Sequence, residues 1–119
     1  MTPGRNEDLL IEIVNRPSGV QVLKLSGPLT LRTLFEFQET ARRHAQHPLV
    51  VDAEGIPYMD SAGLGAIIGI FASCQRTGQK FAISSVPERV MVLFEMTGVR
   101  GLLPCFDSLD DAETAVTST

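Results

Sequence analysis

Residues 50–75 read VVDAEGIPYMDSAGLGAIIGIFASCQ, and this stretch decides the fold. Its first two residues belong to the apolar run of residues 49–51, which is typical of a buried strand. After Ser61, apolar residues return at helical spacing, at Leu64, Ile67, Ile68 and Phe71. The pattern predicts a strand, a loop and then a helix that begins near Ser61. Asp and Ser are favoured at such a start because their side chains accept hydrogen bonds from the first free N–H groups.

The predicted helix carries no charged residue between Ser61 and Gln75, although a surface helix normally has a charged outer face. We expect its apolar stripe to pack on a sheet. The opposite face is small and uncharged and comprises Gly65, Ala66, Gly69, Ile70 and Ser73. Either another element covers this face or a partner docks on it. Ser61 would lie at its edge, near the positive end of the helix dipole.

Length and composition limit the possible functions. A chain of 119 residues with 44% hydrophobic content predicts one domain, placed at residues 9–117 after a flexible segment of residues 1–8. The net charge of −4 argues against nucleic-acid binding. The first residues contain no apolar signal segment, and no uncharged run reaches the roughly 20 apolar residues of a membrane span. Cys74 and Cys105 lack metal or redox spacing, which favours buried apolar roles in a reducing cytosol.

The first part of the chain predicts a hairpin and a helix. Strands are expected at residues 9–14 and 20–26, joined by a turn at residues 16–19 that contains Pro and Gly. Thr30 is expected to cap a helix that runs to about His47. The inner face of this helix is predicted to carry Leu31, Leu34, Phe35, Ala41 and Ala45.

The last part of the chain continues the alternation of strands and helices. A strand is expected at residues 80–84, and a helix from Pro87 to a stop at Gly98. A short extended segment at residues 102–106 precedes a last helix capped by Ser108. The order predicts an α/β fold with a mixed β-sheet, built from a hairpin and then alternating strands and helices, and with the helices mainly on one face.

Few residues fit a catalytic role. His44 and His47 fall together at the end of the first predicted helix, where a cation suits the dipole. Ser61 is not in a G-x-S-x-G nucleophile turn, because Met59 occupies the place of the first glycine. We therefore predict no enzymatic activity and no catalytic residue.

The glycines at the start of the central helix only partly match a dinucleotide-binding fingerprint. Gly63 and Gly65 fit, but Ile68 occupies the third glycine position and the next strand lacks an acidic ribose partner. We interpret Gly63, Gly65 and Gly69 as positions of close backbone packing, and we predict no cofactor.

Two aspartates flank the central loop and could form a carboxylate pair. Asp60 is more simply explained as a helix cap, and Asp52 as a polar strand terminus that accepts hydrogen bonds from loop N–H groups. We therefore predict no metal site.

The sequence VVDAEGIPYMDSAGLGAIIG, residues 50–69, strongly resembles the STAS domain of bacterial anti-sigma-factor antagonists. In that family a strand, a loop and an M-D-S-x-G-L-G turn precede the second helix. The resemblance extends from Val20 to Gly98. It includes the L-x-G-x-L pattern at residues 25–29 and the segment PERVMVLFEMTGV, residues 87–99, which is similar to the third helix of the family.

The resemblance implies a regulatory binding module. Family members bind an anti-sigma factor that is also a serine kinase of the GHKL ATP-binding type, and they thereby free a sigma factor. The kinase phosphorylates the serine that matches Ser61, and a metal-dependent phosphatase removes the phosphate. We accordingly expect a cytoplasmic protein that contacts no nucleic acid and does not insert into a membrane.

The predicted partner surface surrounds Ser61, the predicted phosphorylation site, and comprises Thr30, Asp60, Ala62, Gly63, Gly65, Ala66, Gly69, Ile70 and Ser73. Asp52 is predicted to lie just behind it. One departure from the family is Thr30, which stands where members commonly carry an acid, and Pro28 also replaces a frequent acid.

The Thr30 departure keeps a second function open, a STAS subunit that docks on the ATPase of a membrane transport system and is never phosphorylated. A third possibility is a nucleotide or small-ligand sensor that uses the glycine-rich helix start as an anion site.

Overall fold

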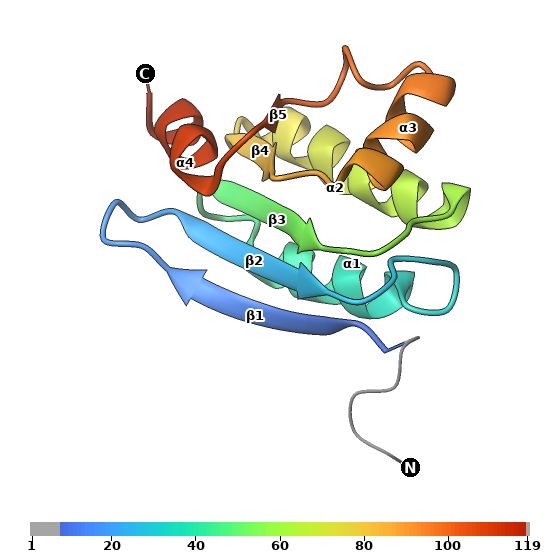
Figure 1. Cartoon of the computed structure of the whole chain (residues 1–119). Coiled ribbons are helices and arrows are strands. Elements are labelled where there is room, and N and C mark those ends of the chain that lie inside the picture. The colour runs from blue at the N-terminus through green and yellow to red at the C-terminus, as the bar shows by residue number, and fades with distance from the viewer. Residues whose placement is uncertain (1–7, 119) are drawn as a thin grey trace.

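The chain folds into a five-stranded sheet flanked by helices (Figure 1). The computed structural model describes residues 8–118, so nearly all of the segment predicted to be flexible, residues 1–8, lies outside the described residues. In chain order the elements are β1 (Leu10–Asn15), β2 (Gln21–Ser26), α1 (Leu34–His44), β3 (Leu49–Gly55), α2 (Ser61–Thr77), β4 (Phe81–Ser84), α3 (Glu88–Met96), β5 (Cys105–Phe106) and α4 (Leu109–Thr117).

The strands lie side by side in the order β1-β2-β3-β4-β5. β1 is antiparallel to β2, as the hairpin prediction required, and β2 to β5 are parallel. Gly19 closes the hairpin turn with a φ of 91°, a conformation that other residues rarely adopt. α1, α2 and α3 connect successive parallel strands. All three helices therefore begin on the side of the sheet where the C-terminal ends of the parallel strands lie.

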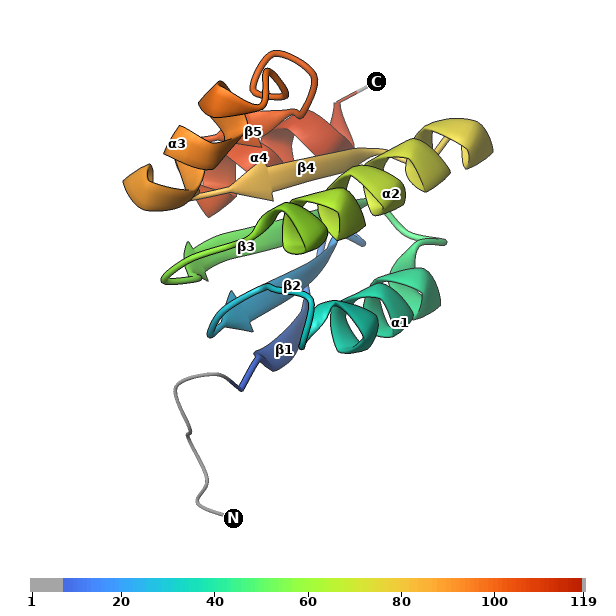
Figure 2. The same ribbon diagram turned by 90° about the vertical axis from the view of Figure 1, so that its right-hand side faces the viewer.

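The helices cover the two faces of the sheet unequally (Figures 1 and 2). Because side chains alternate along a strand, Val51 belongs to the larger core under α1, α2 and α3, whereas Val50 belongs to a smaller core under α4. The prediction of a mixed sheet with helices mainly on one face is confirmed. Within residues 8–118, none of the helices is long and apolar enough to cross a bilayer.

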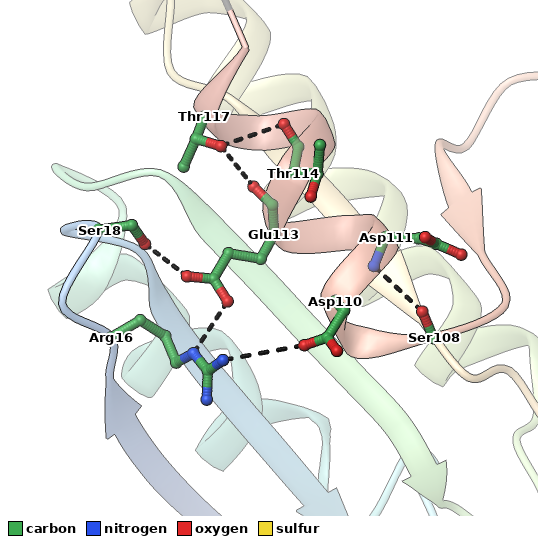
Figure 3. Close-up of polar contacts among 8 residues, drawn as sticks. All are labelled: Arg16, Ser18, Ser108, Asp110, Asp111, Glu113, Thr114 and Thr117. Atoms are coloured by element: carbon green, nitrogen blue, oxygen red, sulfur yellow. Dashed lines mark hydrogen bonds and ion pairs between the residues drawn. The ribbon is translucent and has the colours of Figure 1, made fainter.

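α4 is fastened to the hairpin turn by polar contacts (Figure 3). The Glu113 carboxylate accepts hydrogen bonds from Ser18 Oγ at 2.6 Å and from Arg16 Nε at 2.9 Å. The hydrogen bond from Ser18, and then the hydrogen bond and positive charge of Arg16, lower the pKa of the Glu113 carboxyl against the opposing effect of burial. The predicted cap of this helix is confirmed, since Ser108 Oγ accepts from Asp111 N–H at 3.0 Å.

α1 is shorter at both ends than predicted. It begins at Leu34 rather than at Thr30, and it ends at His44 rather than near His47. The residues before it form a turn in which the Thr30 carbonyl oxygen accepts hydrogen bonds from the N–H groups of Thr33 and Leu34, at 3.0 and 2.9 Å. Thr30 therefore does not cap the helix.

The predicted inner face of α1 is also partly wrong. Leu31 and Phe35 are 64% and 73% exposed. Phe37 is completely buried instead, and it fixes the rotation of the helix on the sheet. The buried residues of α1 are Leu34, Phe37, Thr40 and Ala41.

Candidate functional site

Two loops meet at the beginning of α2. Leu29 forms an isolated parallel bridge with Met59, and the Leu29 carbonyl oxygen accepts a hydrogen bond from Asp60 N–H at 3.3 Å. The loop that follows β2 is thereby held against the loop that follows β3. This contact brings Thr30 into the neighbourhood of Ser61, as the family resemblance implied.

The Asp60 carboxylate joins these loops a second time. Asp60 is the N-cap residue of α2, and its Oδ1 accepts a hydrogen bond from Gly63 N–H at 2.8 Å. Its Oδ2 accepts from Leu31 N–H at 3.1 Å. The interpretation of Asp60 as a helix cap is confirmed. The same side chain also holds the turn that precedes α1, which sequence reasoning did not anticipate.

Ser61 is the first residue of α2, and it is exposed. Within residues 8–118, no hydrogen bond ties up its hydroxyl, and Asp60 rather than Ser61 caps the helix. The first N–H groups of a helix lack partners within the helix and form the positive end of its dipole. A phosphate attached to Ser61 would therefore find favourable electrostatics within the chain itself.

Only one of the three helix glycines is closely packed. A Cβ atom on Gly63 would lie 2.1 Å from the Leu29 carbonyl oxygen, so no side chain fits there. A Cβ atom on Gly65 or on Gly69 would meet nothing within 4 Å. The close-packing interpretation is confirmed for Gly63 and is wrong for Gly65 and Gly69, which face open space.

The predicted outer face of α2 also needs correction. Ala66 and Ile70 are only 2% and 4% exposed and belong to the core, on a helix that packs beside α1 (Figure 2). They cannot contact a partner in this conformation. As far as Ser73 the small outward residues are nevertheless uncharged, and we call them the small-residue face: Ser61, Ala62, Gly65, Gly69, Ala72 and Ser73. Exposed Arg76 follows them in the last turn of the helix.

Asp52 does not lie behind Ser61. It is two residues beyond Val50 on β3, so it projects from the sheet face that carries α4, whereas α2 covers the other face. Asp52 is buried, and its Oδ1 accepts a hydrogen bond from Glu54 N–H at 3.1 Å. The turn role predicted for Asp52 is confirmed, and the structure separates it from Ser61 by the thickness of the sheet. Across the described part of the chain, no three His, Cys, Asp or Glu side chains gather as a metal site.

Thr30 takes part in the turn rather than presenting a free side chain. Its N–H donates to Thr33 Oγ1 at 3.0 Å, and its own Oγ1 accepts from Arg32 N–H at 3.2 Å.

The thiols of Cys74 and Cys105 differ in environment. Cys74 is buried as expected, whereas Cys105 is only partly buried. Burial raises the pKa of both thiols, and nearby Arg100 partly offsets this for Cys105.

Sequence reasoning missed a group of exposed apolar side chains beside Ser61: Leu31, Phe35 and Tyr58. The signal that could have found Leu31 and Phe35 is the spacing of Leu34, Phe37 and Ala41, which competes with the stripe that starts at Leu31. A helix cannot bury both stripes on one flat sheet. No pattern in the sequence distinguishes Tyr58 as exposed.

Most of the chain matches a known family of domains. Residues 13–112 match the model of the STAS domain family. The chain belongs to this family. One relative is the anti-sigma-B factor antagonist of Staphylococcus epidermidis, which is 30% identical over 99 residues, covering 81% of this chain and 91% of the relative. The STAS-type fold predicted from the sequence is therefore confirmed.

Solved structures of STAS proteins have the same fold. The anti-sigma factor antagonist from Mycobacterium paratuberculosis superposes with a TM-score of 0.83 at 21% identity, covering 93% of this chain and 96% of that chain. The Bacillus cell fate determinant SpoIIAA, solved in its phosphorylated form, superposes with a TM-score of 0.68 at 14% identity, covering 88% of this chain and 97% of that chain.

Proposed function

We propose that this STAS domain is an anti-sigma-factor antagonist, and that phosphorylation of Ser61 switches its binding off. The observation that carries the proposal is the exposed Ser61 hydroxyl at the first position of α2, next to an Asp60 that already caps the helix. Membership of the family and the relative named as an anti-sigma-B factor antagonist support the choice of partner. That SpoIIAA has a phosphorylated form supports the mode of regulation.

The unmodified form is suited to docking. The small-residue face carries no charge, so a partner can cover it without stripping water from an ion. Small side chains also let the backbone of a partner approach α2 closely. The unmodified hydroxyl of Ser61, at the edge of this face, can remain hydrated or find a hydrogen-bond partner in the complex.

Phosphorylation changes the electrostatics of the same place. A phosphoserine adds about −1.5 to −2 charges, and it does so directly beside the Asp60 carboxylate. The N-terminus of α2 stabilises the anion in the free chain, so the fold survives. In a complex that buries the phosphate without a counter-charge, the cost is about 3–5 kcal/mol. This corresponds to a loss of affinity of roughly a hundredfold or more.

The partner chemistry follows from the same proposal. A GHKL-type anti-sigma factor with serine kinase activity transfers the γ-phosphoryl group of ATP to Ser61 Oγ, which loses its proton, and ADP leaves. A metal-dependent phosphatase hydrolyses the ester and returns the hydroxyl and inorganic phosphate. The chain supplies only the acceptor hydroxyl, acts in the cytoplasm and binds no nucleic acid.

Mass spectrometry of the intact chain tests this proposal. The purified chain is incubated with ATP and, one at a time, with each GHKL-type anti-sigma factor encoded in the same genome. We expect one phosphate group with one of these kinases, no phosphate on Ser61→Ala, and retained binding of that kinase by Ser61→Ala. No phosphate with any of them, or stable co-purification of the unphosphorylated chain with a transporter ATPase, would overturn the proposal.

A further inference from the structure

An apolar patch lies on the surface beside Ser61. We define the apolar patch as Leu31, Phe35 and Tyr58, whose exposed fractions are 64%, 73% and 48%. All seven aromatic residues of the chain fall within the described range, and among them only Phe35 and Tyr58 are exposed. Single exposed apolar residues are common, but these two aromatics lie on segments joined by the hydrogen bond between Leu29 and Tyr58, and grouped apolar residues mark a candidate interaction site.

Hydrogen bonds place the apolar patch next to the start of α2. The Tyr58 carbonyl oxygen accepts from Leu29 N–H at 3.3 Å, and Leu31 N–H donates to Asp60 Oδ2 at 3.1 Å. Phe35 lies in the first turn of α1, four residues after Leu31, which is in the turn that leads into this helix. The apolar patch is therefore continuous with Ser61 through the two joined loops.

We propose that the apolar patch is part of the docking surface for the anti-sigma factor, and that it receives apolar side chains of that partner. This inference rests on the proposed function. The patch and the small-residue face are both uncharged, whereas exposed Arg32 and Glu36 directly follow Leu31 and Phe35 in the chain. An apolar aromatic centre with a polar border is the usual composition of an interface that binds tightly.

The small-residue face and the apolar patch make different contributions to binding. The small-residue face allows close approach and senses the charge at Ser61. The apolar patch supplies the buried area, since the side chains of Leu31 and Phe35 are largely exposed in the free chain. A partner that covers Ser61 also covers the loops that Asp60 joins, and the patch begins at those loops.

Serine substitutions in the patch test the inference, with an equally exposed apolar control elsewhere. Leu31→Ser and Phe35→Ser are compared with Met96→Ser. Met96 is 80% exposed and ends α3, a helix that contributes no residue to the apolar patch or to the small-residue face. The probe is the purified GHKL-type anti-sigma factor that phosphorylates the unsubstituted chain. We expect each patch variant to bind at least tenfold more weakly and Met96→Ser to bind within twofold of the unsubstituted chain.

Kinase kinetics provide a second readout. With the patch variants as substrates, we expect KM to rise by about tenfold while kcat is unchanged, because the patch contributes binding but does not touch the transferred phosphoryl group. A fall in kcat with unchanged KM would mean that the substitutions displace Ser61, and it would overturn the inference. Equal thermal midpoints for all three variants and the unsubstituted chain check that each one folds.

The outcomes separate this inference from the proposed function. If no anti-sigma factor binds the unsubstituted chain, both fail. If Ser61 is phosphorylated and the patch variants bind as tightly as the unsubstituted chain, only this inference fails. If the unsubstituted chain forms a dimer in sedimentation experiments, and Phe35→Ser abolishes the dimer without weakening partner binding, the patch joins two copies of the chain and the inference is again wrong.

Discussion

Gly63 differs from the other glycines of α2 because it has no room for a side chain. We expect Gly63→Ala to lower the free energy of unfolding by about 1–3 kcal/mol, since its Cβ would press on the Leu29 carbonyl group. Gly65→Ala is the matched control. It should raise the free energy of unfolding by about 0.5–1 kcal/mol, because alanine is the better helix former and nothing blocks it. Urea unfolding measures both, and equal effects would contradict this account.

Asp60 is the residue on which the site geometry depends. We expect Asp60→Ala to lower the free energy of unfolding by about 1–2 kcal/mol, because α2 loses its cap. The Leu31 N–H also loses its acceptor, so its hydrogen exchange should become faster. Asp60→Asn keeps one side-chain oxygen, so its free energy of unfolding should lie between those of the unsubstituted chain and Asp60→Ala. Unchanged exchange of the Leu31 amide in Asp60→Ala would show that the bond between the loops is unimportant.

The sequence predicts the role of a single residue where that role depends only on neighbours in the sequence. The Asp60 cap and the position of Ser61 follow from the pattern of one short segment. The second hydrogen bond of Asp60, to Leu31, depends on two loops that are distant in the sequence, and no local pattern contains it. The close approach of Leu29 to Gly63 is hidden in the same way, because a glycine in a helix looks identical whether it is crowded or open.

The sequence predicts which segments form strands and helices, but it predicts less well which face of each helix packs on the sheet. The apolar residues of the helix predicted from Thr30 to about His47 offer two competing stripes, one through Leu31 and Phe35 and the other through Leu34 and Phe37. The sheet takes the second, which leaves the first exposed. In α2 nearly every residue is small or apolar, so hydrophobicity alone cannot distinguish buried Ala66 from outward Gly65. The packing of α1 beside α2 decides it.

α4 is an element whose attachment depends on pH. Because the folded pKa of Glu113 is lowered, its carboxylate stabilises the fold above the unfolded pKa of about 4.3, and this stabilisation is lost as pH falls through the folded pKa. We expect Glu113→Gln to lower the free energy of unfolding at pH 7 by about 0.2–1 kcal/mol, since the pair with Arg16 is partly exposed.

Urea unfolding at pH 7 and again near pH 3 measures this contribution. The unsubstituted chain should lose more stability on acidification than Glu113→Gln, which lacks the titrating group. Asp110→Asn is the matched control, because that carboxylate lies 3.9 Å from Arg16 and is almost fully exposed. A Glu113→Gln variant with the same pH dependence as the unsubstituted chain would show that the contacts in Figure 3 do not hold α4.

For the molecule as a whole, the strand order β1-β2-β3-β4-β5 decides on which face of the sheet the helices lie. Short helical connections between parallel strands put α1, α2 and α3 on one face and bring their first residues to one sheet edge. Ser61 therefore lies on the same side of the sheet as the loop that follows β2. The hydrogen bonds of the sheet and the two cores do not involve this residue.

This separation predicts that phosphorylation alters recognition without altering the fold. In the chain labelled with nitrogen-15, phosphorylation of Ser61 should shift the amide signals of the first turn of α2 and of the loop bonded to Asp60, including Leu31. Signals of α4 should stay in place, because α4 lies on the other face of the sheet. Ser61→Asp should reproduce the direction of the shifts, with smaller size because it adds less charge. Widespread shifts that reach α4 would instead mean that the switch works through a rearrangement of the sheet, which the packing of its two cores resists.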